Sequence, residues 1–172
     1  MSPARRPIQA SIRLGNDDAA DAGSELKDTM AHWATGVAVM AVRYHGGVQS
    51  ITVNSFIAVS LEPPTILVSL SEQAAILHAL NATGRFTISI LGEDQTRAAT
   101  MVSDRIPTAQ RLFGSEEDPV LKESIVTLVC ATSQTHQAGD HILYLAIVER
   151  MLPGKDAPPL LYYRRNYHRL PH

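Results

Sequence analysis

Residues 52–64 carry more hydroxyl and amide side chains than a plain buried strand needs, among them Thr52, Asn54, Ser55 and Ser60. Short polar side chains beside accessible backbone groups suit a flavin. The pyrimidine edge of its ring system presents donors and acceptors, and its ribityl chain is a row of hydroxyls. A strand that ends in a turn with two prolines explains the same composition through ordinary turn chemistry. The residues by themselves leave both interpretations open.

Two later segments also carry groups capable of chemistry. Gly139-Asp140-His141 precedes an apolar run, so it either presents an imidazole to a cofactor or forms a local turn whose histidine is satisfied nearby. Tyr162 to Tyr167 combines aromatic and basic residues. It either stacks on a ring and meets a phosphate, or forms a surface cluster. These two segments are the remaining candidates for a site.

The chain lacks the signatures of several other classes. It contains no G-x-S-x-G, phosphate-loop, G-x-G-x-x-G or H-E-x-x-H pattern, and we expect no metal site among its seven histidines. The one cysteine, Cys130, lies beside an apolar run and is predicted to be buried and inert. The net charge is −2, without a basic stripe or a bilayer-length apolar segment. We therefore expect neither nucleic acid nor membrane as a partner.

The length of 172 residues suits one domain, over 24–172, preceded by a flexible N-terminal arm over 1–23. The arm has no apolar core of a secretory signal, so a cytoplasmic protein is expected. A helix is predicted to begin at Ser24 as its cap and to end at Gly36. Its apolar residues Leu26, Met30 and Trp33 recur on one face and are expected to pack on a core.

Strands outnumber helices in the rest of the pattern. Alternating or β-branched stretches predict strands over 37–44, 48–56, 65–70, 86–91, 125–133, 141–151 and 160–163. Short helices are predicted over 74–82, ended by Gly84, and over 94–102, capped by Asp94, with a long surface loop over 104–119. Because helices and strands do not alternate regularly, the pattern favours a mainly β fold, a closed β-barrel with helical decoration.

Six short motifs follow one another between about Leu26 and Tyr167. They are ATGVAV at 34–39, TVNSF with VSLEPP over 52–64, Leu91 with Asp94-Gln95, RLFG at 111–114, GDH at 139–141 and PLLYY at 159–163. In this order they resemble the flavin reductase-like domain family, which includes the small reductase components of two-component flavin-dependent monooxygenases. One such motif would be weak evidence, but six in register over one domain outweigh the turn and surface interpretations above.

The resemblance implies a split β-barrel of the FMN-binding type with a Greek-key core, assembled as a homodimer with flavin near the interface. It implies an NAD(P)H:flavin oxidoreductase that transfers hydride from NADH or NADPH to FMN or FAD. The reduced flavin would then pass to a partner monooxygenase. FMN and FAD are not distinguished by these motifs, and neither are NADH and NADPH.

The resemblance also implies roles for particular residues. His141 would lie beside the nicotinamide as the catalytic residue. The expected flavin contacts lie in three parts of the chain: Thr52, Val53, Asn54, Ser55, Val59 and Ser60; then Ser69, Leu70 and Ser71 along the ribityl chain and phosphate; and finally Arg164 and Tyr167, which would close the site.

The chain departs from the family pattern at several positions. Ala74-Ala75-Ile76 stand where many members carry Ser-x-Thr for the flavin phosphate, and Ala146-Ile147-Val148 replace the usual Gly-Glu-Val. These changes motivate an alternative, a flavin-binding protein without reductase turnover that acts as a carrier or sensor. A different enzyme on a similar barrel, such as a pyridoxamine-phosphate oxidase or a haem-handling protein, is opposed by the TVNSF and GDH motifs.

Overall fold

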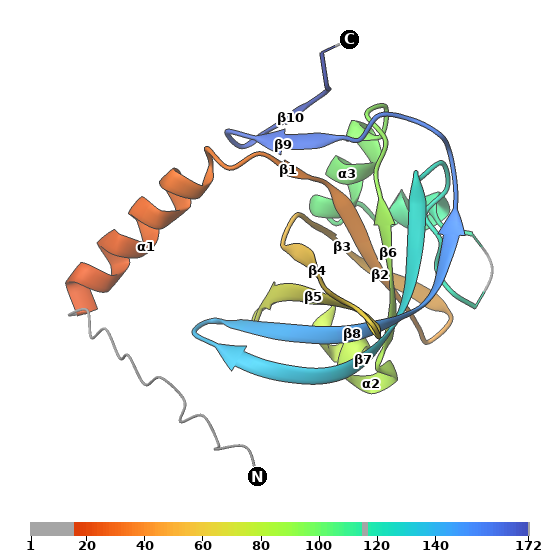
Figure 1. Cartoon of the computed structure of the whole chain (residues 1–172), viewed down its shortest axis with the longest axis horizontal. Coiled ribbons are helices and arrows are strands. Elements are labelled where there is room, and N and C mark those ends of the chain that lie inside the picture. The colour runs from red at the N-terminus through yellow and green to blue at the C-terminus, as the bar shows by residue number, and fades with distance from the viewer. Residues whose placement is uncertain (1–15, 115–116, 172) are drawn as a thin grey trace. The chain divides into compact units, whose positions relative to one another are not determined.

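The computed structural model describes residues 16–114 and 117–171, with side chains from Asp21 onward. The chain divides into two compact units, Met1–Trp33 and Ala34–His172, and each is considered by itself (Figure 1). Within the described part of the chain, no helix has both the length and the apolar character that crossing a membrane requires.

The described part of the N-terminal unit contains one helix, α1 (Asn16–Met30). It starts earlier than predicted, so Ser24 lies inside the helix instead of capping it, because the preceding alanine- and aspartate-rich segment also favours a helix N-terminus. The predicted arm is therefore helical from residue 16, and its first 15 residues lie outside the described residues. Leu26, Met30 and Trp33 are 62%, 51% and 68% exposed, so the expected packing on a core is not seen within this unit.

The larger unit contains two antiparallel sheets and short helices. The seven-stranded sheet has the order β3-β2-β6-β7-β8-β5-β4, and the three-stranded sheet has the order β1-β9-β10. The strands of the large sheet are β2 (Ala38–Tyr44), β3 (Gly47–Val53), β4 (Phe56–Leu61), β5 (Pro64–Ser71), β6 (Arg85–Ile90), β7 (Val126–Ala138) and β8 (His141–Pro153). Those of the small sheet are β1 (Thr35–Gly36), β9 (Leu161–Tyr163) and β10 (Asn166–His168). The helices are α2 (Leu77–Thr83), α3 (Thr96–Ser103) and a 3-10 helix over Pro107–Leu112.

Each predicted strand has a counterpart, but the stretch 48–56 is not one strand. It breaks after Val53, and a second strand, β4, begins at Phe56. The short strand β10 and the 3-10 helix were also missed. Gly84 ends α2 with a left-handed φ of 66°, as expected. The predicted cap of α3 is wrong, because Asp94 precedes the helix and its carboxylate pairs with Lys155.

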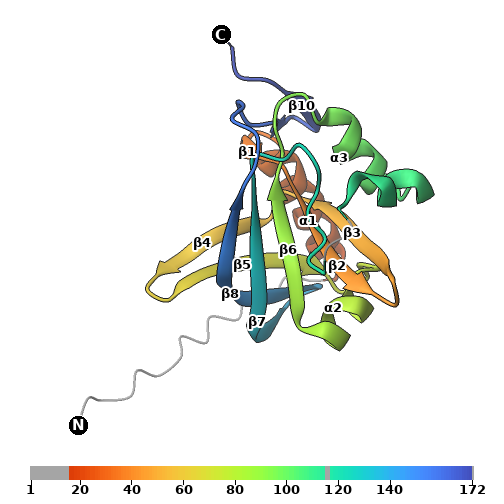
Figure 2. The same ribbon diagram turned by 90° about the vertical axis from the view of Figure 1, so that its right-hand side faces the viewer.

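The large sheet curls until its two edges are adjacent at one corner. Its edge strands are β3 and β4, at opposite ends of the strand order, yet only Asn54 and Ser55 separate them in the chain. A two-residue link spans only about 7–10 Å between strand ends. The two edges must therefore meet there, and Figure 2 shows β3 and β4 diverging from this region toward opposite sides.

Two apolar clusters stabilise the curled sheet, one on each of its faces. Ala38, Met40 and Val42 of β2 point into the inner cluster, which Tyr144 also joins. The intervening β2 residues, such as Val39, point to an outer cluster formed with α3 and the loop that follows it. Strand β2 is thus buried on both faces, and this accounts for its continuous run of apolar residues.

Buried hydroxyl groups attach the loop over 117–124 to the sheet. Thr87 Oγ1 donates to the carbonyl oxygen of Pro119 (2.8 Å), and Ser89 Oγ accepts from the backbone N–H of Leu121 (3.3 Å). Cys130, in contrast, is a fully buried thiol, and burial raises its pKa to about 12. The predicted burial of this thiol is confirmed.

Replacing Gly154 by alanine should lower the free energy of unfolding by about 1–3 kcal/mol. A β-carbon at this position would lie 2.0 Å from the carbonyl oxygen of Ser124, so the backbone would have to shift. Chemical denaturation measures the loss. Gly36→Ala is the control, because a β-carbon there has no neighbour within 4 Å. Equal stability of the two variants would contradict the prediction.

Candidate functional site

The corner between β3 and β4 is fastened to β5 by two hydrogen bonds. Ser55 Oγ donates to the carbonyl oxygen of Ser69 (2.6 Å), and the backbone N–H of Ser69 donates to the carbonyl oxygen of Ser55 (2.9 Å). These bonds place the polar residues of the first candidate segment next to the C-terminal end of β5. The structure therefore brings together two groups of residues that are separated in the sequence.

Two polar side chains at the corner have internal partners. Thr52 Oγ1 donates to the carbonyl oxygen of Ala99 in α3 (2.8 Å), so its hydroxyl oxygen is left to accept from a ligand. Asn54 Nδ2 donates to Thr35 Oγ1 (3.2 Å) at an exposed position. Thr52 thus has a structural bond as well as a possible ligand contact, whereas Asn54 lies open to solvent.

A pocket of about 180 Å³ opens at this corner. Its lining comes from the residue between β1 and β2, the end of β3 with the link that follows, the end of α3 and the β9–β10 hairpin: Val37, Thr52, Val53, Asn54, Ser103, Tyr162 and Tyr167. The ring centroids of Tyr162 and Tyr167 lie 5.5 Å apart. Burial raises the pKa of Tyr167, and the nearby Tyr162 and Asp104 raise it further. The phenol therefore stays neutral and can donate a hydrogen bond at neutral pH. Ser103 was missed by the sequence analysis, since a serine at the end of a helix carries no recognisable signal.

The sheet register places Ser69, Ser71 and His141 on one face. Ser69 pairs with Leu143 and Ser71 pairs with His141, and the intervening Leu70 points to the inner cluster with 2% exposure. Since successive side chains of a strand point to opposite faces, the three polar residues share the outer face of β5 and β8. Leu70 can therefore reach a ligand only through its backbone.

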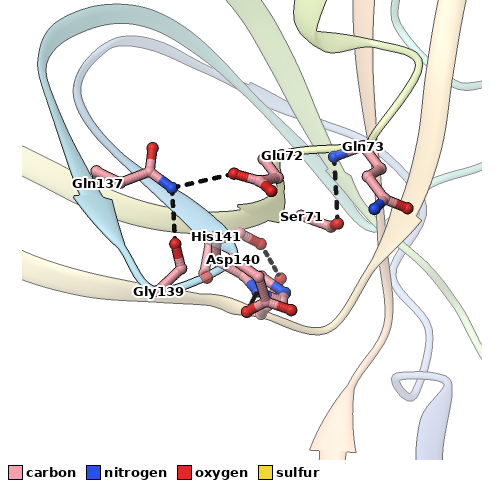
Figure 3. Close-up of polar contacts among 9 residues, drawn as sticks. Ser71, Glu72, Gln73, Gln137, Gly139, Asp140 and His141 are labelled. Carbon is pink, nitrogen blue, oxygen red and sulfur yellow. Dashed lines mark hydrogen bonds and ion pairs between the residues drawn. The ribbon is translucent and has the colours of Figure 1, made fainter. Parts of the chain in front are cut away.

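His141 begins β8 directly after a two-residue turn (Figure 3). Gly139 is the first turn residue and has a φ of +61°, a conformation that glycine adopts without strain. Asp140 is the second, and its Oδ1 lies 2.8 Å from His141 Nδ1. The hydrogen bond from His141 lowers the pKa of Asp140. The GDH motif therefore forms a turn that presents a half-exposed imidazole.

Four of the twelve predicted site residues line the pocket, and Val59, Ser60 and Arg164 are among those that do not. Val59 and Ser60 lie near the far end of β4, where Ser60 bonds to Glu62 in the β4–β5 turn. Arg164 lies in the β9–β10 turn with its guanidinium over the ring of Tyr163, 5.4 Å from the centroid. Tyr163 alternates with the pocket residue Tyr162, so Arg164 is directed away from the pocket within this chain.

One family motif proves to be structural. The side chain of Gln95 is buried: its Oε1 accepts from the backbone N–H of Gly92 (3.0 Å), and its Nε2 donates to the carbonyl oxygen of Lys122 (2.9 Å). These bonds tie the start of α3 to the loop over 117–124. A glutamine in this motif is thus explained by the fold.

A curled antiparallel sheet with a polar corner beside an aromatic pocket and an exposed imidazole defines a β domain suited to a planar ligand with polar edges. The family model of the flavin reductase like domain matches residues 30–171. The chain belongs to this family.

Individual relatives agree with this membership. The reductase component of 4-hydroxyphenylacetate 3-monooxygenase from Thermus thermophilus is 33% identical over 145 residues, which cover 84% of this chain and 95% of the relative. The NADH-dependent flavin reductase StyB from Pseudomonas fluorescens is 35% identical over 167 residues, or 93% and 98% of the two chains. The solved structure of the styrene monooxygenase flavin reductase from Pseudomonas putida is 34% identical, with a TM-score of 0.77 over 86% of this chain and 98% of that one.

Asn54→Ala should weaken flavin binding by about 1–3 kcal/mol, the cost of losing an amide contact, while leaving the stability of the apoprotein nearly unchanged. The reason is that Asn54 is exposed and its bond to Thr35 lies at the surface. Fluorescence titration of flavin and thermal unfolding give the two quantities. Gln49→Ala, an exposed amide at the other end of β3, is the matched control. A variant that loses stability but keeps its flavin affinity would show that Asn54 is structural.

Proposed function

We propose that this protein is an NADH-dependent flavin reductase that supplies reduced flavin to a partner monooxygenase. The observation that carries the proposal is the β5–β8 register, which sets Ser71 opposite His141 beside the corner at Asn54. Relatives of similar length support it, since they are named as NADH-dependent flavin reductases or as reductase components of monooxygenases. Its reduced nicotinamide substrate and single buried thiol are consistent with a cytoplasmic protein.

The residues at the corner suit the polar edge and side chain of a flavin. Asn54 and Ser55 are exposed groups that can donate and accept, as the pyrimidine edge requires. Ser69 and Ser71 are half-buried on the adjoining face, in the direction that a ribityl chain would follow. Tyr162 and Tyr167 offer aromatic surface in the pocket. We assign the flavin to this corner, with FMN or FAD as acceptor.

When bound, the flavin supplies the redox chemistry by accepting a hydride from the reduced nicotinamide. The protein's own contribution is to position the two ring systems and to exclude water. His141, on the same face as Ser69 and Ser71, can hydrogen-bond to the nicotinamide nucleotide through Nε2. The hydride step itself needs no side-chain acid or base, so His141 acts by holding the substrate.

A second copy of this chain would complete the site. The pocket of about 180 Å³ is smaller than the roughly 300–1,000 Å³ typical of ligand pockets, so one chain encloses only part of a flavin. The outer face beside Ser69 and His141 is also apolar, with half-buried Leu67, Leu145 and Ile147 and the 61%-exposed Ile57 on the edge strand. Contiguous apolar surface of this kind usually marks an interface. We infer a homodimer of two split β-barrels of Greek-key type.

The alternative, a flavin carrier or sensor without turnover, draws on the segment Ala74-Ala75-Ile76. Ile76 is 2% exposed and Ala74 packs against the inner cluster, so this segment supports the core and offers no side-chain hydroxyl to a phosphate. A weak phosphate contact would favour release of the flavin. Release of reduced flavin is what a reductase component must achieve, and for this reason we favour the reductase.

Purified protein should oxidise NADH continuously when FMN or FAD is added, and His141→Ala should raise the KM for NADH about 2- to 10-fold. This factor corresponds to one lost contact of about 0.5–1.5 kcal/mol. The KM for flavin should change less, because His141 is assigned to the nicotinamide side. Stopped-flow reduction over a range of NADH concentrations measures both effects. Flavin binding without NADH oxidation would show that the protein is a flavin carrier or sensor. An unchanged dependence of the rate on NADH concentration in His141→Ala would show that His141 does not contact the nicotinamide nucleotide.

Light scattering at micromolar concentration should give twice the mass of the chain. Ile57→Glu places a charge on the exposed apolar face and should shift the protein toward the monomer, with weaker flavin binding as a consequence. Circular dichroism verifies that the variant is folded. Leu170→Glu, an exposed leucine near the C-terminus, is the control and should stay dimeric. A wild-type protein that is monomeric at these concentrations would refute the dimer.

A further inference from the structure

The backbone of Asp140 is held at the tip of the β7–β8 hairpin from both sides. The backbone N–H of Glu72, directly after β5, donates to the carbonyl oxygen of Asp140 (2.9 Å). On the other side, Gln137 Nε2 donates to the carbonyl oxygen of Gly139 (2.8 Å) and lies 3.4 Å from Glu72 Oε2 (Figure 3). The turn is therefore joined to the end of β5, and the position of Asp140 is set by two strands.

The side chain of Asp140 determines how the imidazole of His141 is oriented. Its Oδ1 lies 2.8 Å from Nδ1 of the ring, and a carboxylate can only accept, so the proton of this bond resides on Nδ1. The ring is then restrained in rotation, and Nε2 is left as the nitrogen available to a ligand. The same hydrogen bond lowers the pKa of Asp140.

The contact between Asp140 and His141 contributes little to the stability of the fold. The two side chains are 86% and 43% exposed, and exposed ion pairs are typically worth about 0–1 kcal/mol. The turn itself is held by backbone bonds and by Gln137, which do not involve the carboxylate. Removing the carboxylate should therefore change the orientation of the ring while leaving the hairpin intact.

We propose that Asp140 is a positioning residue for hydride transfer, which holds His141 as the Nδ1–H tautomer with Nε2 directed toward the nicotinamide nucleotide. The inference rests on the proposed function. In the reaction, two electrons and a proton leave the reduced nicotinamide as hydride, the nicotinamide is oxidised and the flavin is reduced. Asp140 forms and breaks no covalent bond in this step. It acts only through the imidazole.

The first test observes the tautomer without any turnover. Long-range ¹H–¹⁵N correlation spectra of the histidine rings, with His141 assigned by its absence in His141→Ala, should show a protonated Nδ1 in the wild type. This signature should disappear in Asp140→Ala. It should persist in Asp140→Asn, because the amide oxygen can still accept from Nδ1–H. A ring that keeps the Nδ1–H form in Asp140→Ala would overturn the proposal.

The second test compares kinetics in a double-mutant cycle. Asp140→Ala should raise the KM for NADH about 2- to 10-fold, nearly as much as His141→Ala, whereas Asp140→Asn should stay within about 2-fold of the wild type. In the His141→Ala background, Asp140→Ala should add no further change, since the group it orients is gone. Asp156→Ala, which removes an exposed aspartate from the loop after β8, is the matched control.

Two kinetic results would overturn the proposal. Additive effects of the two alanine substitutions would show that Asp140 acts independently of His141. An Asp140→Asn variant as impaired as Asp140→Ala would show that charge, not orientation, matters. If wild-type protein failed to oxidise NADH, the proposed function would fail, but the tautomer spectra would still decide whether Asp140 orients the ring.

Discussion

The two-residue link between β3 and β4 is the constraint on which the site depends. Asn54 and Ser55 connect strands that lie at opposite edges of a seven-stranded sheet, so the sheet has to curl until the edges meet. At that corner the hydrogen bonds of a continuing edge are interrupted, and Ser55 bonds to Ser69 instead. Polar side chains and backbone groups are consequently left accessible at this corner.

Curling also determines which faces of the strands can hold a ligand. The inner face is filled by apolar side chains such as Met40 and Tyr144, which leave no space for a cofactor. The outer face of β2 and β3 is covered by α3, whereas the outer face of β5 and β8 bears half-buried leucine and isoleucine side chains. The ligand is thus expected on the outside of the curled sheet, where a second copy would meet it.

The placement of His141 in the β7–β8 hairpin depends on both short-range and long-range contacts. Gly139 and Asp140 form the turn and orient the ring within three residues, a local arrangement. The position of that ring relative to Ser71 depends on pairing between β5 and β8, across some 70 residues of chain. A local motif can therefore prepare a side chain for chemistry, while the sheet decides what the side chain faces.

The sequence by itself determined the strand-rich class, the turn at Gly139, the end of α2 at Gly84 and the buried Cys130, because these depend on local alternation, glycine conformations and apolar runs. Family motifs also nominated the corner residues and His141 as candidates for the site. Only the tertiary structure showed that Gln95 is structural, that Ser103 lines the pocket and that Arg164 is directed away from it. These facts arise from contacts between segments distant in the chain, and no local pattern encodes which face of a strand meets which neighbour.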